Sequence, residues 1–408
     1  MAFAKCSALC TLFLLVPTAS FAQALGPSPA PATEASPPAP AHNEGHKPWY
    51  EKFTIRGYAQ LRYNVNLSNS AVKMDTDRSV GGPDDFILRR ARVVLSGDPT
   101  SWASVYIQTD LAGVVSGAAD NAQNFAQLRD LYGDIFLDAD KEFRIRLGIS
   151  KVPYGFENMQ SSQNRGPFER SDALNSATPG ERDIGVFAYW APASVRKTYK
   201  MLVDSGLKGS GDYGVVGLGV YNGAGLGYPE SNADKHLLLR LAFPFQIGGQ
   251  ILELNVGGYT GKIGVRPGTG TAAPAAGSAT DTLDRRVYAG VILYPRPIGF
   301  QAEYNVGIGA ESEGNRFVRR NQALDGGYVM VNAKIGPVFP YARAFRYDGG
   351  KKVATNSPHE VTYEGEGGVE VQIGKFLELT AAVAYTSRTV QGTEQKGSLA
   401  RFQAQINY

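Results

Sequence analysis

Arginines at alternate positions are the residues of this sequence whose type and spacing suggest a chemical role. Arg90 and Arg92 share one face of the segment FILRRARVVLSG, and Arg89 stands at the start of that run. Arg144 and Arg146 repeat the spacing in EFRIRLGIS. In a β-strand, successive side chains point to opposite faces, so each pair forms a row of positive charge opposite a row of apolar side chains. Such rows act through their electric field.

Catalytic signatures are weak by comparison. The string GSGDYG (209–214) fits a GxGxxG pattern, but VVGLGVYNG follows it and has the pattern of a strand instead of the helix that phosphate binding needs. The string therefore predicts a β-turn. There is no GxSxG serine motif, and His236 and His359 have no cysteine partner. We expect no catalytic residue and no cofactor. A hydrolase embedded in a membrane barrel remains an alternative, because its catalytic residues need not be close in sequence.

The first 22 residues have the pattern of a secretory signal peptide. Lys5 supplies a charge, ALCTLFLLV an apolar stretch and the tripeptide SFA a cleavage site. The apolar stretch is too short to span a bilayer, and a buried N-terminal helix is the alternative. Both cysteines, Cys6 and Cys10, lie in residues 1–22. The mature chain would therefore have neither disulfides nor a thiol nucleophile.

Residues 23–48 are dominated by proline and alanine and contain no aromatic residue. Such a segment buries too little to order itself, which predicts a disordered periplasmic tether. His42 and His46 lie in it, and we expect them to be solvated, since nothing there fixes a coordination geometry. No metal site is predicted. A structural anchor between membrane and cell wall is a further alternative, which this tether favours.

Composition narrows the class of protein. The formal net charge is +3, or +2 without Lys5, which excludes a strongly basic nucleic-acid-binding protein. Beyond residue 22 no apolar run approaches the ~18 residues of a membrane helix, and no long stretch has clear helical periodicity. From Trp49 onward the chain shows strand-type alternation, as in KFTIRGYAQLRYN and FLELTAAVAYTS. Sixteen to eighteen such stretches can be placed.

The connections between these stretches are alternately short and long. Short ones are 98–101 and 138–142, and long ones are 64–84, 151–182 and 262–284. A water-soluble sandwich would also alternate, but its loops would not separate by length so clearly. A closed membrane barrel explains both features, because its apolar face meets lipid and its polar face lines a wet lumen. We therefore predict that residues 49–408 form an all-β, transmembrane antiparallel β-barrel of about 16 strands.

The barrel fixes where the arginines and the C-terminus lie. A guanidinium facing lipid at mid-bilayer would cost about 2–4 kcal/mol, so the arginine rows should face the lumen. The chain ends in SLARFQAQINY, in which apolar and polar residues alternate up to Tyr408. We expect this strand to close the barrel, with Tyr408 at the membrane interface as a terminal aromatic that the barrel-assembly machinery reads.

Three segments in order carry a resemblance to a known family. FILRRARVVLSG, LRDLYGDIFLD and RLGISKVPYGFENMQSSQNRGPFERSDAL, followed by GERDIGVFAYW, are similar to the phosphate-selective porins of the O and P type. The similarity is strong over 85–190 and weaker, in compatible register, to the C-terminus. It implies sixteen strands, a homotrimer and a long loop folded into the lumen, which residues 151–182 would form.

The resemblance also assigns residues. Arg89, Arg90 and Arg170 match arginines that line the constriction of this family, and Asp130 matches an acidic residue nearby. The constriction loop itself would carry the charged residues Lys151, Glu157, Arg165 and Glu169. An alternative is that the arginines hold the loop in place by pairing with Glu157 or Glu169.

Departures from the family pattern weaken the case for a dedicated phosphate site. Ala103 and Asn158 stand where the phosphate-selective members carry lysines, and Tyr58 stands where they carry an arginine. Late strands place glutamates on the inner face, at Glu303, Glu364, Glu366, Glu370 and Glu378. Facing the early arginines, they would create a transverse field, as in a general diffusion porin. We expect an outer-membrane channel for small hydrophilic solutes, in contact with outer-membrane lipid, that favours small anions such as phosphate and has no nucleic-acid partner.

Overall fold

The computed structural model describes residues 48–68, 84–114, 123–228, 230, 232–264, 281–312, 319–352 and 357–408. The predicted signal peptide (1–22) and all but the last residue of the predicted tether (23–48) lie outside the described residues.

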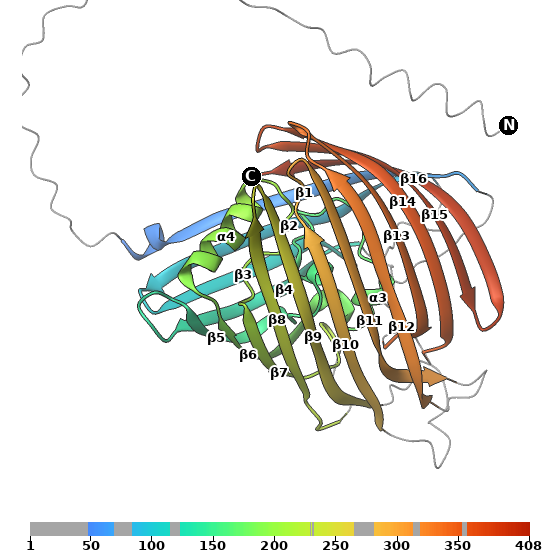
Figure 1. Ribbon diagram of the computed structural model, residues 1–408, viewed down its shortest axis with the longest axis horizontal. Coiled ribbons are helices and arrows are strands. Elements are labelled where there is room, and N and C mark those ends of the chain that lie inside the picture. Colours follow the sequence, from blue (N-terminus) through green and yellow to red (C-terminus); the bar gives the residue numbers. More distant parts are fainter. Residues whose placement is uncertain are drawn as a thin grey trace, which may run out of the picture. The chain divides into compact units, whose positions relative to one another are not determined.

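Within these residues sixteen antiparallel strands form one closed barrel, in which neighbours in sequence pair and β1 pairs with β16 (Figure 1). The predicted sixteen-strand barrel is confirmed, and a two-sheet sandwich is excluded. The strands are β1 (Phe53–Asn66), β2 (Asp85–Thr100), β3 (Ala103–Val114), β4 (Gln123–Phe136), β5 (Phe143–Lys151), β6 (Arg182–Trp190), β7 (Val216–Tyr221), β8 (His236–Ile247), β9 (Gln250–Gly264), β10 (Asp281–Leu293), β11 (Ile298–Ser312), β12 (Arg319–Ala333), β13 (Val338–Gly350), β14 (His359–Ile373), β15 (Leu377–Val390) and β16 (Thr393–Asn407).

Short helices lie before β1 and in two of the connections. They are η2 (Trp49–Lys52) before β1, α2 (Phe156–Met159), α3 (Asp172–Asn175) and η3 (Pro179–Glu181) between β5 and β6, and α4 (Ala193–Asp204) between β6 and β7. None of the helices in the described ranges is both long and apolar enough to cross a bilayer.

The strands place their apolar side chains outward. Along β8, Leu237, Leu239 and Leu241 are 55%, 47% and 42% exposed, whereas the alternating residues Leu238 and Arg240 are buried. An apolar exterior around a polar interior is the arrangement of a barrel that faces lipid. The alternation in the sequence therefore reflects two environments, lipid and lumen.

The two ends of the barrel differ in their connections. Turns of two or three residues at 101–102, 248–249 and 374–376 lie at the end that holds Trp49 and Tyr408, whereas the other end has the longer connections and one two-residue turn, 391–392. In outer-membrane barrels the short turns face the periplasm and the long loops face the exterior. We name the two ends periplasmic and extracellular on that basis.

One periplasmic connection contradicts the expected pattern. Residues 191–215, between β6 and β7, are long and include the twelve-residue helix α4, although the sequence showed no clear helical stretch. Val195, Tyr199 and Leu202 are the buried residues of α4, at spacings of four and three. That spacing marks one face of a helix. The spacing is difficult to recognise in the sequence because the segment is short and rich in Lys and Arg.

The connection between β5 and β6 folds into the barrel, as predicted for a constriction loop. Its apolar residues, among them Val152, Tyr154 and Leu174, join a buried cluster with Tyr288 and Phe345 of the barrel wall. Figure 1 shows α3 of this loop beside β11 and β12, and α3 packs on β11, β12 and β13. The loop is therefore held against the wall by hydrophobic burial.

Candidate functional site

Two β-bulges arrange the charged wall of the lumen. Gln60 of β1 pairs with Arg90, but Leu61 pairs with Leu88, so Arg89 is an extra residue of β2. A bulge lets consecutive residues approach the same side of a sheet, and Arg89 and Arg90 both reach Glu169. In the same way Arg129 is an extra residue of β4, beside Asp130. Strict alternation in the sequence could not reveal either bulge.

Glu169 of the inward loop is the centre of the first charge cluster. Its carboxylate accepts hydrogen bonds from Arg62 Nη1 at 2.9 Å, Arg89 Nε at 2.8 Å and Arg90 Nη2 at 3.0 Å. Arg165 Nη2 lies 3.9 Å away. Burial alone would raise the pKa of Glu169, but the surrounding guanidinium groups hold it well below its usual range. The loop is thus fastened to β1 and β2 by a shared carboxylate that stays ionised.

A second cluster continues along the loop. Arg170 Nη1 lies 2.7 Å from Glu181 Oε1, and Arg182 Nη1 lies 2.8 Å from Glu181 Oε2. Arg182 Nη2 also lies 2.9 Å from Asp130 Oδ2 on β4. Burial acts to raise the pKa of Glu181, and the arginines on both sides hold it well below its usual range. Charges of opposite sign therefore alternate from the loop to the wall.

The glutamates of the late strands hold the opposite side of the loop. Glu303 accepts hydrogen bonds from the backbone N–H groups of Phe156, at 2.5 Å, and Glu157, at 2.9 Å. Glu366 accepts one from Phe168 N at 3.1 Å. Arg343 Nη1 lies 2.5 Å from Glu157 Oε1. Two of the late-strand carboxylates, Glu303 and Glu366, and the late-strand Arg343 thus bind the loop, which lies against the glutamate-bearing wall.

Two polar chambers lie in the barrel beside the arginine-bearing wall. The extracellular chamber has a volume of about 360 Å³ and the periplasmic chamber about 590 Å³. Charged residues make up 11 of the 20 residues of the extracellular lining and 10 of the 28 residues of the periplasmic lining. The extracellular lining holds Arg89, Arg90, Arg92, Arg129, Arg170, Lys351, Lys352, Asp110, Glu169, Asp172 and Glu181. The periplasmic lining holds Arg56, Arg146, Lys151, Arg182, Lys208, Lys375, Asp130, Asp204, Asp212 and Glu378.

The chambers are close neighbours. Gln108 lines the periplasmic chamber and Asp110, two residues farther along the same face of β3, lines the extracellular one. Two residues of a strand span about 7 Å. Arg92 of the extracellular chamber donates to Tyr58 Oη of the periplasmic chamber at 3.0 Å. A thin layer of side chains that includes Gln108, Asp110, Arg92 and Tyr58 therefore separates the two chambers.

A second loop enters the lumen from the periplasmic end. In the segment 205–215, which follows α4, Lys208 Nζ lies 2.5 Å from Glu370 Oε1, and both side chains are about 2% exposed. The inward loop donates to this segment from Gln160 Nε2 to the Lys208 carbonyl and from Asn164 Nδ2 to the Gly209 carbonyl. GSGDYG belongs to this luminal segment instead of forming the β-turn that we expected. Sequence reasoning missed this contact between the two loops.

The remaining predicted residues have defined places. Arg146 pairs with Asp134 at 2.7 Å, its guanidinium lies 3.7 Å from the centre of the Tyr132 ring, and it lines the periplasmic chamber. Arg144 pairs with Asp212 at 2.7 Å and is not part of either chamber lining. Lys151 lines the periplasmic chamber, where Nζ donates to two loop carbonyls.

Three further residues singled out in the sequence are Arg165, Glu157 and Tyr408. Arg165 donates within the loop, to the carbonyls of Pro167 and Phe168. Glu157 accepts from the backbone and hydroxyl of Ser171. Neither Arg165 nor Glu157 is part of the two linings. Tyr408 is 57% exposed, and its hydroxyl donates to the Arg92 carbonyl at 3.1 Å. No group of His, Cys, Asp or Glu suited to a metal ion occurs in the described part of the chain.

A closed barrel with an apolar exterior, charged chambers and an inward loop defines an outer-membrane porin. The chain belongs to the phosphate-selective porin O and P family, whose sequence model matches residues 60–407. The resemblance seen in the sequence is therefore confirmed, and membership places the chain among channels instead of enzymes.

Solved structures agree on the fold. An anion-selective porin from Comamonas acidovorans is 12% identical, with 87% of this chain and 99% of that chain covered and a TM-score of 0.50. Pseudomonas putida OprB is 8% identical, with 88% and 94% covered and a TM-score of 0.50. Salmonella typhi OmpF is 12% identical, with 87% and 97% covered and a TM-score of 0.50. Comparison with curated protein sequences gives no match.

Proposed function

We propose that this porin is a passive, water-filled channel for small hydrophilic solutes that favours small anions, phosphate among them. One observation carries the proposal: cations outnumber carboxylates in both luminal chambers. The extracellular lining has seven cationic and four acidic residues, and the periplasmic lining has six and four. In a narrow polar space with low-dielectric walls, such an excess raises the local concentration of anions.

The layer between the chambers is the proposed constriction. Arg92, Asp130 and Arg182 bound it, and it is the place where the two linings come within one or two residues of each other. Most guanidinium groups there are already paired with carboxylates. A permeating anion is therefore attracted by the net positive field of the chambers and not by a single cluster of unpaired arginines. Asn158 adds no donor to this layer, because its Nδ2 donates to the Leu174 carbonyl. Weak anion preference with fast passage is therefore favoured over tight phosphate binding.

Reversal potentials in planar lipid bilayers test the proposal. Wild type in a tenfold KCl gradient should give the sign of modest chloride preference, and millimolar phosphate should reduce its current only weakly. The variant Arg89→Gln/Arg129→Gln removes two cations of the extracellular chamber and should move the reversal potential toward cations. The control Lys235→Gln/Lys396→Gln removes two exposed cations outside both linings and should not.

Other outcomes would change the assignment. A variant with the wild-type reversal potential would show that Arg89 and Arg129 do not act on the permeating ion. Block of wild type by micromolar phosphate would favour a specialised phosphate site. Absence of any ohmic conductance would contradict the channel itself.

We further propose export through the signal peptide 1–22, a periplasmic tether at 23–48, recognition of Tyr408 by the assembly machinery, and a homotrimer. Sequence pattern supports the first three, and family membership supports the trimer. The mass of the exported chain should correspond to a start at Gln23, and cross-linking in detergent should give a three-chain product. A mass that includes residues 1–22, or cross-linking that stops at single chains, would contradict these assignments.

A further inference from the structure

An open apolar groove of about 1050 Å³ runs over the outer surface of β8 to β11. Leu239 of β8, Gly258 of β9, Val287 of β10 and Val306 of β11 are partners in register and form one outward row across it. Leu239, Val287 and Val306 are between 45% and 58% exposed. Gly258 has no side chain, and an added Cβ would lie 3.0 Å from Val287 Cγ1. The surface of this row is therefore lowest at Gly258 of β9, between Leu239 on one side and the two valines on the other.

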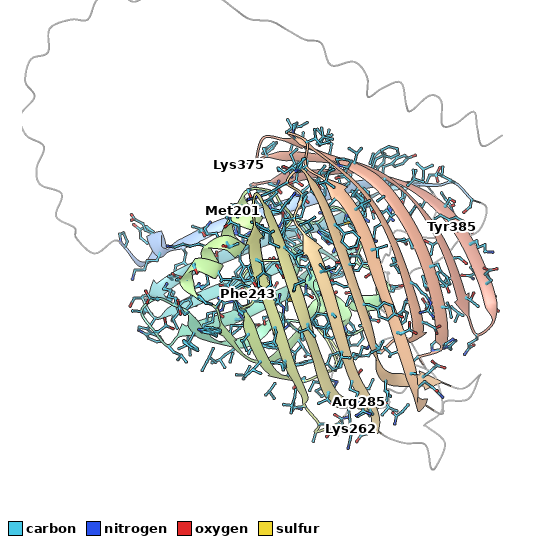
Figure 2. The ribbon with its side chains drawn as sticks, in the orientation of Figure 1. Met201, Phe243, Lys262, Arg285, Lys375 and Tyr385 are labelled. Atoms are coloured by element: carbon cyan, nitrogen blue, oxygen red, sulfur yellow. The ribbon has the colours of Figure 1, made fainter. Side chains whose placement is uncertain are left out.

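Two cations stand at the extracellular end of this groove. Lys262 of β9 and Arg285 of β10 point outward and are exposed, and Figure 2 shows them close together at one end of the barrel. Lys262 pairs in register with Leu283, two residues from Arg285. Within the described residues, neither side chain has an ion-pair or hydrogen-bond partner. Asp281, the acidic residue near Lys262 in register, accepts a hydrogen bond from Asn232.

An outward arginine three strands from β10 shows the contrast. Arg346 of β13 is also on the lipid side, and its guanidinium pairs with Asp325 at 2.5 Å and Asp348 at 2.6 Å. The protein thus neutralises this outward cation with two of its own carboxylates, whereas Lys262 and Arg285 have no carboxylate partner among the residues that the structure describes. A cation near the membrane interface costs only about 0–1 kcal/mol, and it is placed to meet anionic headgroups.

The geometry points to a lipid-binding site: we propose that this face binds a phosphorylated glycolipid of the outer leaflet. Its phosphates would contact Lys262 and Arg285, and its acyl chains would lie in the groove over Gly258. From Lys262 to Leu254, the outward row of β9 spans about 27 Å, close to the ~25 Å height of the apolar band of such barrels. The cations mark the extracellular end, which is why a lipid of the outer leaflet is the occupant.

Native mass spectrometry of the delipidated barrel in detergent tests this site. The probe is lipid A, an acylated disaccharide with two phosphates, compared with its dephosphorylated form, which has the same acyl chains. Wild type should retain the phosphorylated probe, and Lys262→Gln/Arg285→Gln should bind it at least tenfold more weakly. Val287→Phe, which enlarges an exposed side chain of the groove, should also weaken binding.

Matched controls separate the site from general charge. Lys375→Gln/Lys396→Gln makes the same charge change on exposed residues outside the groove, and Lys375 lies toward the opposite end of the barrel in Figure 2. This control should bind like wild type. The β-sheet circular dichroism spectrum and heat-modifiable migration of each variant establish that its barrel is folded.

Four results would overturn the inference. They are equal retention of the dephosphorylated probe, unchanged binding by the double variant, equal binding of phosphatidylglycerol, and a disulfide-linked dimer of Thr260→Cys. In Thr260→Cys the new thiol is the only one in residues 23–408, since the natural cysteines are Cys6 and Cys10. A linked dimer would therefore mean that a second copy covers the groove.

Discussion

Replacing Glu169 by Gln tests how the inward loop and the arginine wall divide their roles. The change keeps the shape and one acceptor of the side chain but removes the charge that Arg62, Arg89 and Arg90 share at 2.8 to 3.0 Å. The extracellular chamber gains one net positive charge. We expect a larger anion preference, and some loss of stability because buried cations lose their partner.

The size of both effects can be estimated. A unit charge about 6 Å from a passing ion contributes about 0.7 kcal/mol at the dielectric constant of water. That is a factor of about 3 in favour of an anion and about 3 against a cation, or roughly tenfold in their ratio. Breaking a buried ion pair by removing one partner costs about 3–5 kcal/mol, and the acceptor that Gln retains reduces this cost.

Reversal potential in a tenfold KCl gradient measures the first effect, and thermal unfolding in detergent measures the second. Glu394→Gln is the matched control, because Glu394 is exposed on an extracellular strand end and its charge is far more screened. Arg89→Gln/Glu169→Gln removes one charge of each sign and should return the selectivity close to that of wild type. A folded Glu169→Gln barrel with the wild-type reversal potential would refute the reasoning.

Two further predictions concern the luminal loops. Lys208→Met leaves Glu370 buried without its cation, so the segment 205–215 should loosen and the noise of the open-channel current should rise. The control Lys200→Gln, on the exposed face of α4, should leave the current noise unchanged. Equal current noise in both variants would contradict the anchoring role of Lys208. The folded-state pKa values of Glu169 and Glu181 are well below the ordinary 4.5, so their stabilisation is complete above pH 4.5 and is lost as the pH falls further. The thermal unfolding midpoint should be constant from pH 8 to 5 and should decrease at pH values below about 4.5, with a smaller decrease in Glu169→Gln/Glu181→Gln. A midpoint that already decreases between pH 7 and 5, by an amount that this double variant abolishes, would contradict the assignment.

Much of the barrel could be predicted from the sequence because strand alternation is local. In SLARFQAQINY each residue's face follows from its parity, and the structure pairs this segment with β1 and β15. The inward loop was predicted from its resemblance to a family. The hydrophobic residues that hold it, such as Val152 and Leu174, had no local pattern that indicated burial inside a barrel.

The charge partners could not be predicted, since they depend on contacts between distant segments. Arg89 reaches Glu169 only because a bulge turns it inward, and Lys208 meets Glu370 from a connection on the periplasmic side. The helix α4 had a detectable trace in Val195, Tyr199 and Leu202, whose spacing fits one helical face. The ion pairs between distant segments, in contrast, are a property of the closed barrel and not of any single strand.

The seam between β1 and β16 has a consequence for how the barrel forms. Every other strand pair joins neighbours in sequence, whereas this seam pairs Tyr58 with Asn407, about 350 positions apart. Loop-closure entropy grows as about 1.5 RT ln n, so bringing these ends together costs roughly 5 kcal/mol before any contact is gained. The hydrogen bonds between Gly57 and Tyr408, at 2.7 and 3.0 Å, can form only when the sheet has curled fully. Closure of the seam is therefore expected to be the slow, late step of folding, in which an open sheet with two unpaired edges becomes a barrel with none.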